Sequence, residues 1–355
     1  MVSSPALPTY RCFVGVDIAA ASFTTIWTAD GRTLPRATTF AQRPSGFAAF
    51  QRQLQATGCA PAQTLVVLEA TGSYWVALAV TLHEAGYAVA VVNPAHLHNY
   101  AQSLPRRGKT DALDAQVCLR FASECQYPPW TPPPAVYHEL RQRLVARDGL
   151  LAMRQQARNQ RHALAQWPVT VGSVVAQLDG VIADLDQRIT RLEAEIGAVL
   201  ADGAWASSAA LLASIPGVGL VTSAWLLVGT LNFRLCATPE QATAYAGLTP
   251  LPRESGTSVR GRAQLGHGGN GRLRTALYMA TLSATRYNPM LKVFYERLRV
   301  AGKPMKVARC AAARKLLHVA WAVVTKERPF DTAYSQRAAC VARSQEVHLT
   351  LTAAA

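Results

Sequence analysis

Apolar and polar positions along the first third of the chain recur with two different periods. Five short apolar or alternating runs predict strands, at residues 12–17, 24–28, 33–40, 64–68 and 87–92. Helical periodicity follows at 45–57, at 73–85 and from Pro94 onward. Three early strands followed by alternating strands and helices predict an α/β domain with a mixed sheet over residues 10–127.

A proline-rich segment follows this domain. Five of the eight residues 127–134 are proline, which predicts a stiff linker at 128–135. Residues 136–202 then form two long helical stretches. The second has a heptad seam made of Leu178, Ile182, Leu185, Ile189, Leu192, Ile196 and Val199. The seam fits an intramolecular helical hairpin and also a homodimeric coiled coil.

Residues 207–331 predict a second, mainly α-helical domain, and the tail 332–355 has no clear pattern. A glycine-containing turn at 215–219 separates two short helices near its start. Gly217 and Gly219 can bring backbone N–H groups against a DNA phosphate, as in helix-hairpin-helix modules; a plain αα-hairpin is the alternative. Residues 207–231 contain no charged residue, but Pro216 interrupts them, so neither half reaches the ~20 residues that span a bilayer.

The charge of the chain indicates a polyanionic partner. The formal net charge is +15, and residues 250–331 carry 16 Lys or Arg against 4 Asp or Glu. The seven cysteines are scattered without a C-x-x-C pair, which predicts reduced thiols rather than disulfides or zinc ligands. With no signal-peptide pattern at the N-terminus, we expect a cytoplasmic protein that does not enter a membrane.

Four carboxylates lie at the ends of predicted elements in the first domain. Asp17 and Glu69 each end a strand, so parallel pairing of the two strands would place them side by side. Asp111 and Asp114 are three residues apart at a helix start with Thr110 as N-cap, so both point to one face. Clustered carboxylates repel unless cations neutralise them, which predicts a Mg²⁺ site acting on phosphodiesters. Each acid alone also fits a capping or solvent-exposed role, but their order is typical of RNase H-like nucleases.

Ser255 lies in a glycine-rich and arginine-rich loop of the second domain. Arg253, Arg260 and Arg262 can clamp a phosphate, and Gly256 lets the backbone approach a ligand closely. A serine hydroxyl needs a base or a metal to become a good nucleophile. No His-Asp pair lies nearby in sequence, so activation would come from the carboxylate centre. The alternative is a phosphate-binding loop in which Ser255 only donates a hydrogen bond.

Nine short motifs occur in a fixed order within residues 11–331. They are Val-Gly-Val-Asp17, Glu69-Ala70-Thr71-Gly72, Asn93-Pro94, Lys109-Thr110-Asp111 with Asp114-Ala115, Ile215-Pro216-Gly217-Val218-Gly219, Tyr245-Ala246-Gly247-Leu248-Thr249-Pro250, Glu254-Ser255-Gly256, Ser258-Val259-Arg260-Gly261 and Leu277-Tyr278-Met279. In this order they resemble the insertion-sequence transposases of the IS110 family, relatives of the pilin-gene invertases.

The resemblance implies a RuvC-like domain of the RNase H-like fold, a coiled-coil spacer and a C-terminal transposase domain. It implies that Asp17, Glu69, Asp111 and Asp114 are metal ligands and that Ser255 becomes covalently joined to DNA. It further implies donor and target DNA, a bridge RNA and a homo-oligomer, dimer or tetramer, acting at the prokaryotic nucleoid. The expected function is therefore an RNA-guided DNA transposase and site-specific recombinase. A metal-dependent, Holliday-junction-resolvase-like nuclease without a covalent intermediate is the alternative.

Overall fold

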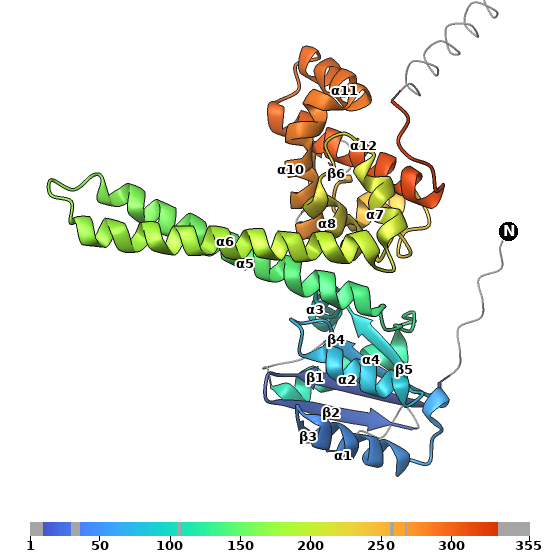
Figure 1. Ribbon diagram of the computed structural model, residues 1–355. Coiled ribbons are helices and arrows are strands. Elements are labelled where there is room, and N and C mark those ends of the chain that lie inside the picture. The colour runs from blue at the N-terminus through green and yellow to red at the C-terminus, as the bar shows by residue number, and fades with distance from the viewer. Residues whose placement is uncertain are drawn as a thin grey trace, which may run out of the picture. The chain divides into compact units, whose positions relative to one another are not determined.

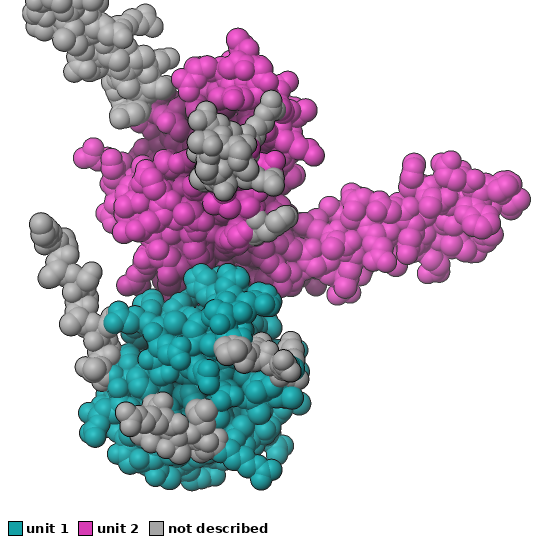
Figure 2. All heavy atoms as spheres, turned by 180° about the vertical axis from the view of Figure 1, so that it is seen from behind, with its two compact units in different colours: residues 1–132 teal, residues 133–355 magenta. Residues whose placement is uncertain are grey.

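The structure, a computed structural model, describes residues 10–29, 36–104, 108, 110–255, 259–266 and 268–332, with the backbone alone at 252–255, 259, 260 and 262. The chain divides into two compact units, residues 1–132 and 133–355 (Figure 2). The division lies between Pro132 and Pro133, inside the proline-rich segment.

The first unit is a five-stranded mixed sheet with helices on both faces (Figure 1). Its elements are β1 (Cys12–Ile18), β2 (Ser22–Thr28), β3 (Thr38–Ala41), α1 (Pro44–Gln55), a 3₁₀ turn (Pro61–Gln63), β4 (Thr64–Glu69), α2 (Trp75–Glu84), β5 (Ala88–Val92), α3 (Pro94–Ser103) and α4 (Asp111–Glu124). The strand order is β3-β2-β1-β4-β5, with β1 antiparallel to β2 and parallel to β4. The predicted mixed α/β sheet is therefore confirmed, although part of the expected third strand, 33–35, lies outside the described residues.

Alternation along the strands builds one hydrophobic core on each face of the sheet. On one face Val66 and Leu68 of β4 pack with Phe50 of α1 and Leu82 of α2. On the other face β4 presents Leu65 and Val67, and β5 presents Ala90 and Val92. These pack with side chains of α3 and α4, namely Leu97, Ala101, Val117, Cys118, Phe121 and Ala122. Strand β4 is thus buried on both sides, which explains its nearly continuous apolar sequence.

A glycine in β1 allows α4 to lie directly on the sheet. An ideal Cβ built on Gly15 would stand 2.1 Å from the carbonyl oxygen of Ala115 and 2.2 Å from the amide nitrogen of Leu119. Both neighbours are backbone atoms, which cannot rotate away. Only glycine therefore permits this approach, and the approach fixes the first turn of α4 near the C-terminal end of β1.

The second unit begins with two long antiparallel helices, α5 (Ala135–Leu164) and α6 (Gly172–Asp202). Leu185, Ile189 and Ile196 of the heptad seam are buried. Five pairs of oppositely charged side chains join the helices at intervals, namely Arg143–Glu195, Arg147–Glu193, Arg154–Asp186, Arg158–Asp186 and Arg161–Asp179. Of the two structures that fit the seam, the chain forms the intramolecular hairpin.

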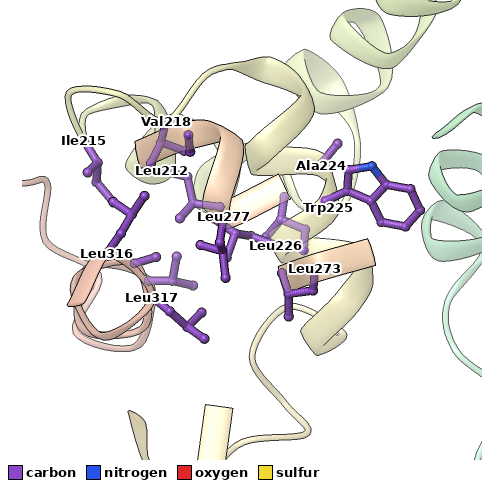
Figure 3. Close-up of a cluster of buried hydrophobic side chains, with 14 of the residues drawn as sticks. Leu212, Ile215, Val218, Ala224, Trp225, Leu226, Leu273, Leu277, Leu316 and Leu317 are labelled. Atoms are coloured by element: carbon purple, nitrogen blue, oxygen red, sulfur yellow. The ribbon is translucent and has the colours of Figure 1, made fainter. Parts of the chain in front are cut away.

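The remainder of the second unit is a helical body with one small hairpin. It consists of α7 (Ala206–Ala213), α8 (Leu220–Thr230), α9 (Pro239–Tyr245), β6 (Pro250–Ser255), β7 (Val259–Leu265), α10 (Gly271–Tyr287), α11 (Pro289–Val300) and α12 (Met305–Thr325). Its core gathers side chains from α7, α8, α10 and α12, among them Leu212, Leu226, Leu277 and Leu316 (Figure 3). No single helix among the described residues is long and apolar enough to cross a membrane, although the bent pair α6 and α7 passes the same test by length and composition.

The interpretation of the segment around Ser255 as a loop was wrong. The segment contains the antiparallel strands β6 and β7, which pair from Pro250 with Leu265 to Ser255 with Val259. The sequence does hold a signal, because small or apolar residues alternate with polar ones through β7, Val-Arg-Gly-Arg-Ala-Gln-Leu. Glycine and arginine obscured that alternation, since neither is a typical strand residue.

Gly15→Ala should destabilise the first unit, because its new methyl group would overlap the backbone of α4. We expect the free energy of unfolding to fall by roughly 1–3 kcal/mol, the usual cost of overpacking. Urea denaturation followed by circular dichroism would measure it. Gly149→Ala, in α5 where nothing lies within 4 Å of the new Cβ, is the control and should stabilise by about 0.5–1 kcal/mol. Equal effects of the two substitutions would contradict the close-packing argument.

Candidate active site

The register of the sheet brings the first two carboxylates together. Val16 of β1 pairs with Leu68 of β4 in the parallel ladder, so Asp17 and Glu69 are the next residues on adjacent strands. Successive side chains on a strand point to opposite faces, and Val16 and Leu68 belong to the α1/α2 core. Asp17 and Glu69 therefore face the opposite side, where Gly15 receives α4.

The start of α4 supplies the other two carboxylates. Thr110 is the N-cap, and its hydroxyl accepts a hydrogen bond from the amide of Leu113 at 3.2 Å. Asp111 and Asp114 lie in the first turn, three residues apart. A helix N-terminus favours negative charge, which lowers the cost of placing two acids there.

Three of these acids line one cavity of about 700 Å³. Asp17 and Glu69 come from the sheet and Asp114 from α4. Helix α3, whose N-cap is Asn93, forms another wall of the cavity. The wall contributes the polar side chains His98, Asn99 and Gln102, which sequence reasoning missed. Their spacing over one helical turn was a usable signal, but without the fold nothing indicated that this turn faces the carboxylates.

Burial and the neighbouring carboxylates alter the protonation of Asp17. Burial, followed by the charges of Asp114, Asp111 and Glu69, raises the pKa of Asp17 from 3.8 to about 6, against a hydrogen bond from the amide of Ile18 that lowers it. Asp111 thus acts on Asp17 although it is not a lining residue. The buried thiol of Cys118 behaves similarly, since burial and then the charges of Asp17, Glu69 and Asp114 raise its pKa well above the usual value.

This donor set fits a divalent cation in its chemistry. Among the described residues, no group of three His, Cys, Asp or Glu side chains could hold a metal ion in its present arrangement. The acids nevertheless offer only oxygen donors, which hard divalent cations prefer. Burial and then the charges of three neighbouring acids raise the pKa of Asp17, and a cation would offset the effect of those charges. The hydroxyl of Thr71 donates to the carboxylate of Glu69, so one of its oxygens already has a hydrogen-bond partner.

Ser255 lies on the second unit, at the end of β6. Its backbone pairs with that of Val259. The side chains of Ser255, Arg253, Arg260 and Arg262, and all of Gly256, lie outside what the structure describes. The serine and the carboxylates thus belong to different units of the chain.

The two glycines expected at a phosphate lie in different surroundings. Gly217 has a φ of +95°, and a Cβ there would stand 2.4 Å from the Cα of Ala284 in α10. Its lack of a side chain is thus required for packing of the turn against α10. Gly219 precedes α8, is exposed and has nothing within 4 Å of its would-be Cβ. Of the two, Gly219 is the one whose surroundings leave room for a ligand.

Comparison with known proteins gives matches in both units. Residues 14–166 match a family described as "Transposase", and residues 209–296 match the "Transposase IS116/IS110/IS902 family". The pilin gene-inverting proteins of Moraxella bovis and Moraxella lacunata are 31% and 30% identical over 324 residues, 90% of this chain and 98% of theirs. The insertion element IS110 43.6 kDa protein of Streptomyces coelicolor is 31% identical over 155 residues, 44% of this chain and 37% of its own.

A chain whose two units both match transposases is an enzyme that cuts and rejoins DNA. It belongs to the IS110 family of insertion-sequence transposases, the family that its ordered motifs resemble. Its substrate is therefore DNA, and its activity is that of a transposase or site-specific recombinase.

Asp17→Asn should stabilise the metal-free protein at neutral pH, because it removes a charge that burial and three neighbouring carboxylates disfavour. The folded state raises the pKa of Asp17 from 3.8 to about 6, so the stabilisation by its proton is complete below the lower value. That stabilisation is lost as the pH rises through the higher value. The variant's advantage in Tm should therefore grow from pH 5 to pH 8 in thermal unfolding with a chelator.

Asp202→Asn, which removes an exposed carboxylate at the end of α6, is the matched control and should show no such trend. A pH-independent difference in Tm between Asp17→Asn and the wild type would contradict the raised pKa of Asp17.

Proposed function

We propose that this transposase cuts DNA by attack of Ser255 on a phosphodiester, assisted by Mg²⁺ held at Asp17, Glu69, Asp111 and Asp114. The observation that carries the proposal is that four carboxylates, from two strands and one helix, lie close enough for three of them to raise the pKa of the fourth, Asp17. The sheet order β3-β2-β1-β4-β5, with β1 flanked by an antiparallel and a parallel neighbour, supports an RNase H-like, RuvC-like first unit.

In the proposed site the strands set the position of the acids before any ligand binds. Asp17 and Glu69 are fixed at neighbouring strand ends, and the N-cap at Thr110 fixes the turn that holds Asp111 and Asp114. A bound Mg²⁺ would supply charge neutralisation and Lewis-acid polarisation of the phosphodiester. The polar wall of α3, with His98 and Asn99, is available to orient the DNA backbone in the cavity.

The covalent step replaces one phosphoester bond of the DNA by a phosphoester bond to Ser255, so the number of phosphoester bonds does not change. The oxygen of Ser255 forms a bond to phosphorus, the bond to one DNA oxygen breaks, and the serine proton leaves to a base while the departing oxygen is protonated. Rejoining reverses this exchange when a DNA hydroxyl attacks the phosphoserine. Since each step exchanges one phosphoester for another, no nucleotide hydrolysis is needed.

We further propose that the chain works as a homo-oligomer, dimer or tetramer, guided by a bridge RNA. Residues 250–331 hold a surplus of twelve cations over acids, which supports a large polyanionic partner. Arg253, Arg260, Arg262, Gly256 and Gly219 are the proposed nucleic-acid contacts, with Gly217 contributing by shaping the turn. These interactions would take place in the cytoplasm at the prokaryotic nucleoid.

A denaturant-resistant protein–DNA adduct should form when the purified protein meets labelled donor and target duplexes, Mg²⁺ and RNA transcribed from the DNA flanking its gene. Ser255→Ala should abolish the adduct because it removes the attacking oxygen. Asp17→Ala should lower its rate by at least about 10²-fold, a usual cost of losing one electrostatic stabiliser. Denaturing gel electrophoresis of the labelled DNA would measure both effects.

Ser258→Ala, three residues from the proposed nucleophile, is the matched control and should keep the adduct. Strand cleavage that survives Ser255→Ala, with no adduct in any variant, would mean that water attacks. The enzyme would then be a metal-dependent, resolvase-like nuclease.

Recombination should require the RNA, because the protein alone supplies charge rather than sequence discrimination. Changing the RNA nucleotides that pair with the target should redirect insertion to a correspondingly changed target, as sequencing of the products would detect. A scrambled RNA of equal length and composition is the control and should support binding without insertion. Efficient insertion without RNA, or at an unchanged site with the altered RNA, would contradict guidance.

A further inference from the structure

The hairpin that carries Ser255 is held at its root by one arginine. Arg274, in the first turn of α10, donates from Nη1 to the carbonyl oxygens of Gly268 at 2.8 Å, Ala246 at 3.4 Å and Gly247 at 3.5 Å. Ala246 and Gly247 precede β6, whereas Gly268 follows β7. The guanidinium therefore joins the segment that enters the hairpin to the segment that leaves it.

The N-cap of α10 makes a second connection at the same root. The backbone N–H of Asn270 donates to the carbonyl of Tyr245 at 2.7 Å, and its side-chain Oδ1 accepts from the amide of Leu273 at 3.1 Å. Leu273 and Leu277 of α10 are fully buried in the core of the unit. The arginine and the cap thus connect the hairpin to a helix that is itself fixed by packing.

Two glycines make room for this contact. Gly247 and Gly269 have φ values of +69° and +82°, which other residues rarely adopt. A Cβ on Gly247 would stand 2.1 Å from Nη1 of Arg274 and 2.3 Å from the carbonyl oxygen of Gly268. A Cβ on Gly269 would stand 2.5 Å from the amide nitrogen of Gly247. The backbone at the root of the hairpin therefore packs closely around the guanidinium and leaves no space for a side chain at either glycine.

We propose that Arg274 is the positioning residue of the nucleophile: it sets the direction of the β6–β7 hairpin and so the location of Ser255. This inference rests on the proposed function of Ser255. Ser255 is five residues beyond Pro250, which corresponds to about 17 Å of strand. Over that length a rotation of roughly 10° at the root would move the serine by about 3 Å, and a 1 Å misplacement can cost on the order of 10²-fold in rate.

The partners of Arg274 also distinguish this role from phosphate binding. A guanidinium that binds DNA uses its N–H groups for phosphates or bases, whereas Nη1 of Arg274 already donates to three backbone carbonyls of a half-buried site. The guanidinium is also planar and rigid, whereas a lysine ammonium on its flexible stem would reproduce these contacts only partly. The loss of Arg274 should therefore affect the geometry of the hairpin and the rate of the covalent step more than the affinity for DNA.

The test compares Arg274→Ala and Arg274→Lys with the wild type in the full-length protein. In Arg274→Ala, amide hydrogen exchange should accelerate across residues 251–265 in the free protein, while the core of α10 stays protected. The rate of serine–DNA adduct formation at saturating DNA should fall by about 10²-fold or more, while the Kd for DNA stays near that of the wild type. Arg274→Lys should be intermediate in both respects.

Added guanidinium ion should partly restore the adduct rate of Arg274→Ala, and sodium chloride at equal ionic strength should not. Arg286→Ala removes the same charge from an exposed position in the last turn of α10. It is the matched control and should resemble the wild type in exchange, in adduct rate and in its lack of response to guanidinium.

Three outcomes would overturn the inference. Unchanged exchange across 251–265 in Arg274→Ala would mean that the arginine does not hold the hairpin. A loosened hairpin with an unchanged adduct rate would mean that it does not position the nucleophile. An equal fall in the adduct rate of Arg286→Ala would mean that the loss of a positive charge alone explains the effect.

An absence of adduct in the wild type would instead refute the proposed role of Ser255, and the exchange measurement would still decide whether Arg274 holds the hairpin. If Arg274→Ala fails to fold, Arg274→Lys gives the same comparison with the cation retained.

Discussion

The carboxylate site depends on the contact between α4 and β1 at Gly15. That contact brings two acids of a helix to two acids of a sheet, and the raised pKa of Asp17 shows that the arrangement is electrostatically unfavourable by itself. Hydrophobic burial offsets the repulsion: the apolar side of α4 buries Leu119 and Phe121, each contributing on the order of 2 kcal/mol. The N-terminus of α4 adds a favourable field for Asp111 and Asp114. The site is thus stabilised by packing a few ångströms away, not by its own interactions.

Local sequence patterns were sufficient to predict the sheet and the acids at its edge. An apolar run ending in Asp17 or Glu69 is a short-range signal, and the cap at Thr110 is another, so the elements could be placed without knowing the fold. The polar wall of α3 could not be predicted in this way. His98 and Asn99 look like ordinary exposed helix residues until tertiary packing brings α3 alongside α4, where Tyr100 stacks edge-on against Phe121.

The second unit was harder to predict, because its informative contacts involve backbone atoms. Every residue has a backbone carbonyl, so the residue type does not reveal which carbonyl accepts a hydrogen bond from Arg274. The close approach of Ala284 to Gly217 cannot be read from the sequence either. Gly217 and Gly219 suggested a phosphate-binding turn, and the glycines around Ser255 suggested a loop. In the structure Gly217 and Gly247 serve close backbone packing, which the same residue type satisfies equally well. The sequence therefore identified the positions but could not separate ligand contact from internal contact.

The chain uses arginine in three physically different ways, which bears on how its charge is available to nucleic acid. In the α5–α6 hairpin, arginines such as Arg143 and Arg147 are matched by glutamates of the facing helix, so they add little to the external field. Residues 250–331 contain four times as many cations as acids, so at least twelve of these charges have no acid within the segment to neutralise them. Arg274 lies in this segment but is turned inward to backbone carbonyls. A polyanion is thus attracted to the same body that orients the proposed nucleophile, and most of the charge that attracts it comes from residues other than Arg274.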